Sequence, residues 1–381
     1  MSLREAARHF PAVVITGPRR AGKTTLLRKV FPDAGYVLLE DPDLQARVRS
    51  DPRAFMEGLR PPVVLDEIQN APELFSYVRT LIDTGRRRMG QWLFTGSQEA
   101  PLMRGISESM AGRAAILQLL PLSLAETAKT SLLHGGFPEV LARPQGRGLW
   151  YASYLQTYLE RDVRAVTNVR DLVTFRRFLA LLASRHGQVL NKSDLASPLG
   201  VSVPTIGAWL NILELTGQII LVPPYFENFG KRLIKSPKVY WGDSGFACYL
   251  LGITSAAELE RSPFLGAVFE GLVAVEILKS QVNCGMRKEL YYFRDQQGLE
   301  VDFLVPRPDS SLWLIEAKAS QTVRPAMASP LLALSRSLPK RSRRSLLVHR
   351  ESRSAVSTTA LASGVEALDM RQFVQELARV R

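Results

Sequence analysis

An eight-residue segment near the N-terminus, GPRRAGKT at residues 17–24, constrains this chain more than any other feature. It matches the pattern GxxxxGK[ST] and lies between a short apolar run, PAVVITG, and a segment with helical spacing, as that pattern requires. Its glycines let the backbone turn so that successive amide groups point into one concavity, and the following helix adds the positive end of its dipole. The sequence therefore predicts a strand, a phosphate-binding loop and a helix, in that order.

This loop predicts ATP and Mg2+ as ligands. The ammonium group of Lys23 is expected to reach the β and γ phosphates, and the hydroxyl of Thr24 to hold Mg2+. The predicted ATP-binding residues are Gly17, Pro18, Arg19, Arg20, Ala21, Gly22, Lys23, Thr24 and Thr25. The side chains of the two loop arginines are given no separate role.

Polar residues that follow two later apolar runs complete the predicted hydrolytic site. The run VVLD ends in Asp66, which we expect to order Mg2+, and Glu67 follows it, which we expect to polarise the attacking water. A second run, WLFTGS, places Thr95 or Ser97 where a side chain can sense the γ phosphate, and we favour Ser97. Together with Lys23, these residues form the predicted catalytic set.

An arginine that approaches the transferred phosphoryl group can speed such a reaction about 10³-fold or more, and it can come from a neighbouring subunit. Arg113, in the segment SMAGR, is our candidate for this role, with Arg104 as an alternative. An arginine supplied in this way requires a homo-oligomer, and we expect a ring.

Short apolar runs alternate with helical patterns over residues 1–140, which predicts an α/β domain with a parallel sheet and helices on its faces. Residues 141–262 begin with a helical pattern. They continue with two short helices, for which Ser193 and Ser202 are the expected caps, and with β-like runs at residues 219–222 and 233–235. This order predicts a winged helix-turn-helix.

The second short helix of this element, residues 203–216, contains no lysine or arginine, so we do not expect it to read DNA bases. The hairpin that follows is basic. Its residues Lys231, Arg232, Lys235 and Lys238 are candidates for contacts with nucleic acid phosphates, although such a hairpin is as often merely solvated.

Residues 263–381 predict a second α/β domain, and acidic residues interrupt two of its apolar strands. Asp302 lies in EVDFLV, and Glu316 and Lys318 lie in LIEAK. Because side chains two residues apart point to the same face of a strand, Glu316 and Lys318 are expected to meet Asp302 from a neighbouring strand. Glu270, on the preceding helix, is expected to complete a second divalent metal site of the kind that nucleases use.

The composition narrows the choice of partners. The 381 residues carry a formal net charge of +13, which favours a polyanionic partner such as DNA, although a genome that favours arginine codons would also produce this charge. No apolar run approaches the length of a membrane-spanning helix, and the N-terminal segment lacks an apolar signal region. We expect a cytoplasmic protein without a membrane partner.

These motifs form an ordered series over residues 10–320, from GPRRAGKTTLL and VVLDEIQNAPELF through GGFPEVL and KVYWGDSGFACYLLG to GLEVDFLV and LIEAK. The series resembles a family of prokaryotic AAA-type (AAA+) ATPases. In that family a P-loop domain is joined to a C-terminal region with winged-helix and PD-(D/E)xK restriction-endonuclease-like parts. The resemblance implies an AAA+ domain with Walker B acids at Asp66 and Glu67, and a nuclease-like module that carries Asp302, Glu316 and Lys318.

Two functional hypotheses follow. The first is an ATP-hydrolysing enzyme that binds, moves, unwinds or remodels DNA, of no strong sequence preference, with metal-dependent cleavage as a secondary activity. The second is a nucleotide-switched signalling or interaction ATPase whose nuclease-like domain is a docking module. The net charge and the acidic set favour the first, and the helix without basic residues favours the second.

Overall fold

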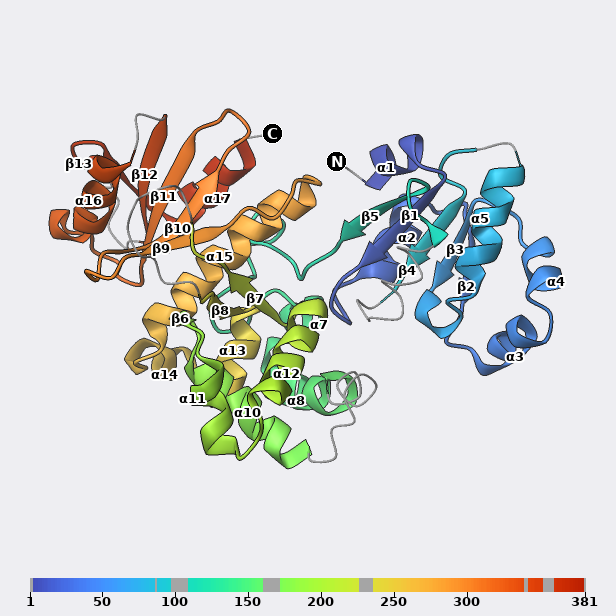
Figure 1. Cartoon of the computed structure of the whole chain (residues 1–381), viewed down its shortest axis with the longest axis horizontal. Coiled ribbons are helices and arrows are strands. Elements are labelled where there is room, and N and C mark those ends of the chain that lie inside the picture. The colour runs from blue at the N-terminus through green and yellow to red at the C-terminus, as the bar shows by residue number, and fades with distance from the viewer. Residues whose placement is uncertain are drawn as a thin grey trace. The chain divides into compact units, whose positions relative to one another are not determined.

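The computed structural model describes residues 3–85, 88–96, 109–159, 172–225, 236–338, 342–351 and 360–379. The chain forms two compact units (Figure 1). The first comprises Met1–Pro121 together with the short segments Leu215–Gly217 and Val282–Met286. The second comprises Leu122–Glu214, Gln218–Gln281 and Arg287–Arg381. The domain boundaries predicted after residues 140 and 262 stay predictions.

The first unit is built on a five-stranded parallel sheet with the strand order β2-β3-β4-β1-β5. Its strands are β1 (Ala12–Thr16), β2 (Gly35–Leu38), β3 (Val63–Asp66), β4 (Trp92–Thr95) and β5 (Ala114–Gln118). The helices between them are α1 (Leu3–His9), α2 (Lys23–Val30), α3 (Pro42–Ser50), α4 (Pro52–Glu57) and α5 (Leu74–Thr84). This arrangement confirms the parallel α/β sheet that the alternating pattern predicts.

Alternation of side chains along the strands explains why the sheet is covered on both faces. Val14 packs with residues of α3, α4 and α5, whereas its neighbours Val13 and Ile15 pack with α1 and α2 on the other face. Both faces are therefore apolar, and polar side chains collect at the carboxyl ends of the strands. Those ends are where ligands bind in open parallel sheets.

The second unit contains a helical part and a small antiparallel sheet with the strand order β6-β8-β7. The strands are β6 (Gln188–Val189), β7 (Ile219–Val222) and β8 (Lys238–Trp241). The helices are α7 (Pro138–Ala142), α8 (Arg147–Tyr154), α10 (Leu172–Ser184), α11 (Lys192–Ala196), α12 (Val203–Leu215), α13 (Ser244–Leu250) and α14 (Ala256–Arg261). Aromatic side chains from α8, α10 and α12 form the centre of its core.

A mixed sheet with the strand order β13-β14-β12-β11-β10-β9 completes the second unit. Its strands are β9 (Tyr291–Arg294), β10 (Glu300–Pro306), β11 (Leu312–Lys318), β12 (Arg343–His349), β13 (Ala360–Ala362) and β14 (Val365–Asp369). The helices are α15 (Leu265–Asn283), α16 (Ser329–Ser337) and α17 (Met370–Arg379). Apolar residues of α15 and α17 cover one face of the sheet, and those of α16 cover the other.

One local expectation for the helix pair needs correction. The cap of α11 is Asn191, whose side chain accepts a hydrogen bond from the backbone N–H of Ser193, so that Ser193 lies inside the helix. Ser202 does cap α12, through the N–H of Thr205. The strand that pairs with β7 is β8 at Lys238–Trp241, and the predicted run 233–235 lies outside the described residues.

Among the described residues, no single helix is long and apolar enough to cross a membrane. The segments Lys192–Leu199 and Val203–Leu215 reach that length and composition only together, and they are bent by 112° relative to each other.

Candidate functional site: the phosphate loop and its acids

The loop between β1 and α2 has the backbone geometry that its glycines permit. Gly17 has φ = 140°, and a Cβ atom there would lie 2.0 Å from the carbonyl oxygen of Leu119. Gly22, directly before α2, has φ = 100°. Only glycine adopts such angles readily, so the conformation of the loop requires glycine at both positions.

Lys23 is the first residue of α2, and its side chain turns back over the loop. It is buried, with 5% of its surface exposed, and its Nζ donates hydrogen bonds to the carbonyl oxygens of Gly17 (3.1 Å) and Pro18 (2.9 Å). The ammonium group is therefore held at the loop, where the motif places the terminal phosphates. Of the other loop residues, Arg20 has a left-handed backbone with φ = 62°.

Asp66 lies at the carboxyl end of β3, and three hydroxyl groups donate to its carboxylate. Thr24 Oγ1 lies 2.9 Å from Asp66 Oδ2, Tyr36 Oη lies 2.6 Å from the same atom, and Thr95 Oγ1 donates to Oδ1. Burial, followed by this hydrogen bond, raises the pKa of Tyr36, so its phenol remains protonated and donates. The sequence analysis did not predict a role for Tyr36. The only indication was a tyrosine in the apolar run that forms β2, the strand beside β3, which ends in Asp66.

Glu67 follows Asp66 in a left-handed conformation with φ = 57°. Its backbone N–H donates to Thr95 Oγ1 over 3.1 Å, and its carboxylate accepts a hydrogen bond from Gln69 Nε2. One hydroxyl group, that of Thr95, thus contacts both acidic residues. Ser97, the alternative that the sequence favoured, lies outside the described residues, as does Arg104.

The structure places Arg113 away from its own phosphate loop. It directly precedes β5, which runs parallel to β1 with Ala114 opposite Ala12, so it lies at the amino end of the strands. The loop leaves β1 at the carboxyl end. The exposed guanidinium pairs with Asp83 through Nε (2.7 Å) and Nη2 (2.8 Å), and this ion pair raises the pKa of Arg113.

The predicted acidic cluster of the second unit does come together. Asp302 Oδ2 accepts a hydrogen bond from the N–H of Ala317 (2.9 Å), and Lys318 Nζ lies 2.6 Å from Glu316 Oε1. Burial, with the nearby charge of Asp302, raises the pKa of Glu316 to about 8 and that of Glu270 to about 7. Among the described residues, no group of three or more His, Cys, Asp or Glu side chains has a metal-holding arrangement. The metal site at these residues stays a prediction.

Lys238 is the residue of this cluster that sequence reasoning placed wrongly. The sequence made it a candidate for a phosphate contact on a basic hairpin, but it is 2% exposed, because β8 is the central strand of its sheet and packs against the acidic residues. Its Nζ lies 2.6 Å from Glu300 Oε1, 2.9 Å from Glu270 Oε1 and 3.5 Å from Asp302 Oδ1. Lys231, Arg232 and Lys235 lie outside the described residues.

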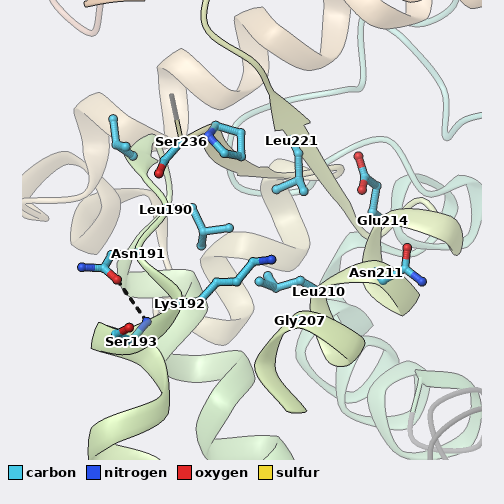
Figure 2. A pocket seen from close by; sticks show the side chains of 12 residues that line it. Leu190, Asn191, Lys192, Ser193, Gly207, Leu210, Asn211, Glu214, Leu221 and Ser236 are labelled. Carbon is cyan, nitrogen blue, oxygen red and sulfur yellow. Dashed lines mark hydrogen bonds between the residues drawn. The ribbon is translucent and has the colours of Figure 1, made fainter. Parts of the chain in front are cut away.

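A groove of about 840 Å³ lies between α11, α12 and the three-stranded sheet (Figure 2). Lys192 and Glu214 both line it, so its walls offer one cation and one acid. Burial raises the pKa of Glu214, while the charge of Lys288 opposes this shift. The groove is polar but not strongly basic.

Three family models match the chain. The model described as "AAA domain" matches residues 9–128, and two that are described as domains of unknown function, DUF8612 and DUF4143, match residues 125–257 and 265–371. The parallel sheet, the phosphate loop and the first of these matches together define the first unit as an AAA+-type P-loop ATPase domain.

Two curated relatives are uncharacterized mycobacterial proteins, Rv2008c of Mycobacterium tuberculosis and Mb2031c of Mycobacterium bovis. Each is 35% identical over 311 residues, which span 80% of this chain and 69% of the relative. The chain belongs to the same family as these proteins.

Solved structures also show similarity. The Walker-type ATPase PABY2304 of Pyrococcus abyssi is 16% identical with a TM-score of 0.44, over 65% of this chain and 93% of that one. RuvB of Thermotoga maritima, in its R170A form, is 18% identical with a TM-score of 0.29, over 57% of this chain and 86% of that one.

Proposed function

We propose that the first unit binds ATP with Mg2+ and hydrolyses it. The observation that carries this proposal is the hydrogen bond between Thr24 and Asp66, which places the last residue of the loop motif against the carboxylate at the end of β3. The Thr24 hydroxyl and the Asp66 carboxylate are oxygen ligands of the kind that Mg2+ prefers. Bound there, Mg2+ would neutralise charge on the phosphate oxygens.

In this proposal the other residues of the site have separate roles. Backbone amides of residues 17–25 cradle the phosphates, and Lys23 contacts the terminal ones. The Glu67 carboxylate orients and polarises the attacking water, and Thr95 fixes the positions of Asp66 and Glu67 relative to each other. Ser97 remains a candidate for contact with the γ phosphate.

Arg113 supports a further part of the proposal, that the active form is an oligomer. Its position at the amino end of β5 prevents it from reaching its own phosphate loop at the other end of the sheet. An exposed arginine in that position can serve the site of a neighbouring subunit. We therefore propose a homo-oligomer, in ring form, in which Arg113 leaves Asp83 to approach the next subunit's phosphates.

We also propose that the second unit binds DNA. We propose that α11, α12, β7 and β8, with β6 pairing to β8, form a winged helix-turn-helix, and the order of these elements supports this. We further propose a restriction-endonuclease-like core, which is supported by the order α15–β9–β10–β11–α16–β12, with β10 antiparallel to both neighbours and β12 parallel to β11. With the net charge of +13, these features favour phosphate contacts, for which Lys231, Arg232 and Lys235 are the candidates.

DNA titrations followed by fluorescence anisotropy test this assignment, with forked, duplex and single-stranded probes at two salt concentrations, with and without a non-hydrolysable ATP analogue. We expect binding that depends on nucleotide and falls steeply with salt, and ATP turnover that DNA stimulates. Binding at the level of an unrelated basic protein, together with unstimulated turnover, would contradict the DNA assignment and leave the ATPase proposal standing.

A second candidate is a nucleotide-switched interaction ATPase whose second unit docks a protein partner. Specific observations favour it: α12 carries no lysine or arginine, and Glu214 places an acid in the groove beside that helix. Cleavage of plasmid DNA with Mg2+ or Mn2+, absent from an Asp302→Ala variant that still hydrolyses ATP, would exclude a purely docking role. Undetectable cleavage by the wild-type protein, together with no DNA binding, would favour it.

A further inference from the structure

Tyr36 contacts the acid of the nucleotide site from a strand that carries none of the predicted site residues. It lies in β2, at the edge of the parallel sheet, opposite Val64 of β3. Val64 and Asp66 are two residues apart and therefore share one face of the sheet, so the long side chain of Tyr36 can extend along that face to Asp66. Its hydroxyl donates to Asp66 Oδ2 over 2.6 Å. A residue outside the phosphate loop and the acidic motif thus takes part in the site.

A residue of α2 also covers the ring of Tyr36. The guanidinium carbon of Arg28, in the last turn of that helix, lies 5.1 Å from the ring centre, where a cation is attracted by the face of an aromatic ring. The same helix begins with Lys23 and Thr24. The Tyr36 side chain therefore lies between the helix that follows the phosphate loop and the acid at the end of β3, and both contacts restrict its position.

The carboxylate of Asp66 has more hydrogen-bond donors than its burial alone requires. Asp66 is 2% exposed, and Thr24 Oγ1 lies 2.9 Å from Oδ2 and 3.1 Å from Oδ1, while Thr95 donates to Oδ1. These two threonines already give each buried oxygen a partner. Tyr36 adds a second donor to Oδ2, the oxygen that lies nearer to Thr24, and so opposes rotation of the carboxylate.

We propose that Tyr36 is a positioning residue for Mg2+ in the nucleotide site. Its hydroxyl acts through Asp66, because it holds the carboxylate in the orientation that Mg2+ binding with Thr24 requires. Hydrogen-bond partners behind metal ligands commonly set the affinity for the metal. The inference rests on the proposed function of the first unit, the binding of ATP with Mg2+, and it assigns part of the Mg2+ affinity to Tyr36.

Tyr36→Phe in the full-length protein tests this proposal, because it removes the hydroxyl and keeps the ring that Arg28 covers. Tyr77→Phe, on α5 of the same unit, is the matched control. Binding of a fluorescent, non-hydrolysable ATP analogue is measured first in EDTA and then during titration with Mg2+. We expect Tyr36→Phe to bind the analogue in EDTA as the wild-type protein does, and its complex with the analogue to bind Mg2+ about tenfold more weakly.

Two further measurements separate positioning from a general loss of structure. Turnover by Tyr36→Phe should approach the wild-type rate at high Mg2+ concentration, because the defect is in Mg2+ affinity. Tyr77→Phe should match the wild-type protein in analogue binding, Mg2+ affinity and turnover. Tyr36 is 39% exposed and its ring is retained, so we expect the folded state of Tyr36→Phe to persist.

Wild-type Mg2+ affinity in Tyr36→Phe would overturn this inference and leave the ATPase proposal standing. A loss of analogue affinity in EDTA as large as the loss in Mg2+ would also overturn it, since Tyr36 would then support only the structure of the loop. If the wild-type protein shows no Mg2+-dependent binding of the analogue, the proposed function itself fails, and the inference fails with it.

Discussion

The hydroxyl group of Thr24 lies 2.9 Å from the carboxylate of Asp66, although 41 residues separate them in the chain. The contact arises because β1 and β3 both end at the carboxyl edge of one parallel sheet, so the loop after β1 meets the last residue of β3. This hydrogen bond brings together the phosphate loop and the acid at the end of β3 before any ligand binds.

Glu67→Gln is expected to bind ATP with nearly wild-type affinity and to hydrolyse it at least about 10²-fold more slowly, because the amide cannot act as a base. Lys23→Ala serves as the contrasting variant, since loss of its charge should abolish binding itself. Binding is measured with a fluorescent ATP analogue and turnover by phosphate release. Wild-type turnover by Glu67→Gln would show that another residue activates the water.

Thr95→Val is expected to lower the rate of hydrolysis by about tenfold or more, with a smaller effect on ATP binding. The substitution keeps the shape of the side chain but removes the hydroxyl that contacts both Asp66 and the backbone of Glu67. Thr84→Val, on the exposed end of α5, is the matched control. Equal effects on hydrolysis and on binding would indicate that Thr95 serves only to hold the loop together.

Arg113→Ala is expected to reduce turnover by about 10³-fold while leaving ATP binding and the melting temperature nearly unchanged. Asp83→Ala, which removes the ion-pair partner and keeps the arginine, should retain activity. Mixing Arg113→Ala with the inactive Lys23→Ala protein should restore part of the turnover, because a Lys23→Ala subunit supplies Arg113 to the intact phosphate loop of an Arg113→Ala neighbour. No recovery over a range of mixing ratios would argue against an arginine shared between subunits.

The stability of the second unit should fall as pH rises from about 4.5, the ordinary pKa of a glutamate, to about 8. Burial raises the pKa of Glu270 to about 7 and of Glu316 to about 8, so in this range the folded state binds more protons than the unfolded state. The free energy of unfolding then decreases with pH, by an amount on the order of 1 kcal/mol per pH unit for each such group. Buried His186, whose pKa is lowered from 6.5 to about 4, opposes this trend between these two pH values, because there the unfolded state binds the additional proton.

Denaturant titrations at several pH values, followed by tryptophan fluorescence, measure this slope. Glu316→Gln should flatten it, because the substituted side chain no longer titrates. Glu351→Gln changes an exposed glutamate and should keep the wild-type slope. An unchanged slope in Glu316→Gln would mean that other groups account for the pH dependence.

The amino-acid sequence by itself determined the local parts of this protein. The spacing of residues 17–24 predicts a loop between a strand and a helix, and both elements are present. This prediction needs only local sequence, because the turn and the concavity of amide groups are formed by residues adjacent in the chain. The positions of Asp66 and Glu67 after an apolar strand follow in the same way. Period-two alternation likewise predicted that Glu316 and Lys318 would meet, and their ion pair is present.

Tertiary structure decided which distant residues share a site. Nothing in the sequence near Lys238 indicates that it lies among Glu270, Glu300 and Asp302, since the contact depends on how the small sheet packs against α15 and β10. The same is true of Tyr36, which reaches Asp66 only because β2 pairs with β3. Burial and charge compensation are properties of the packed chain, so a lysine that looks solvated in sequence becomes the central cation of a buried acidic cluster.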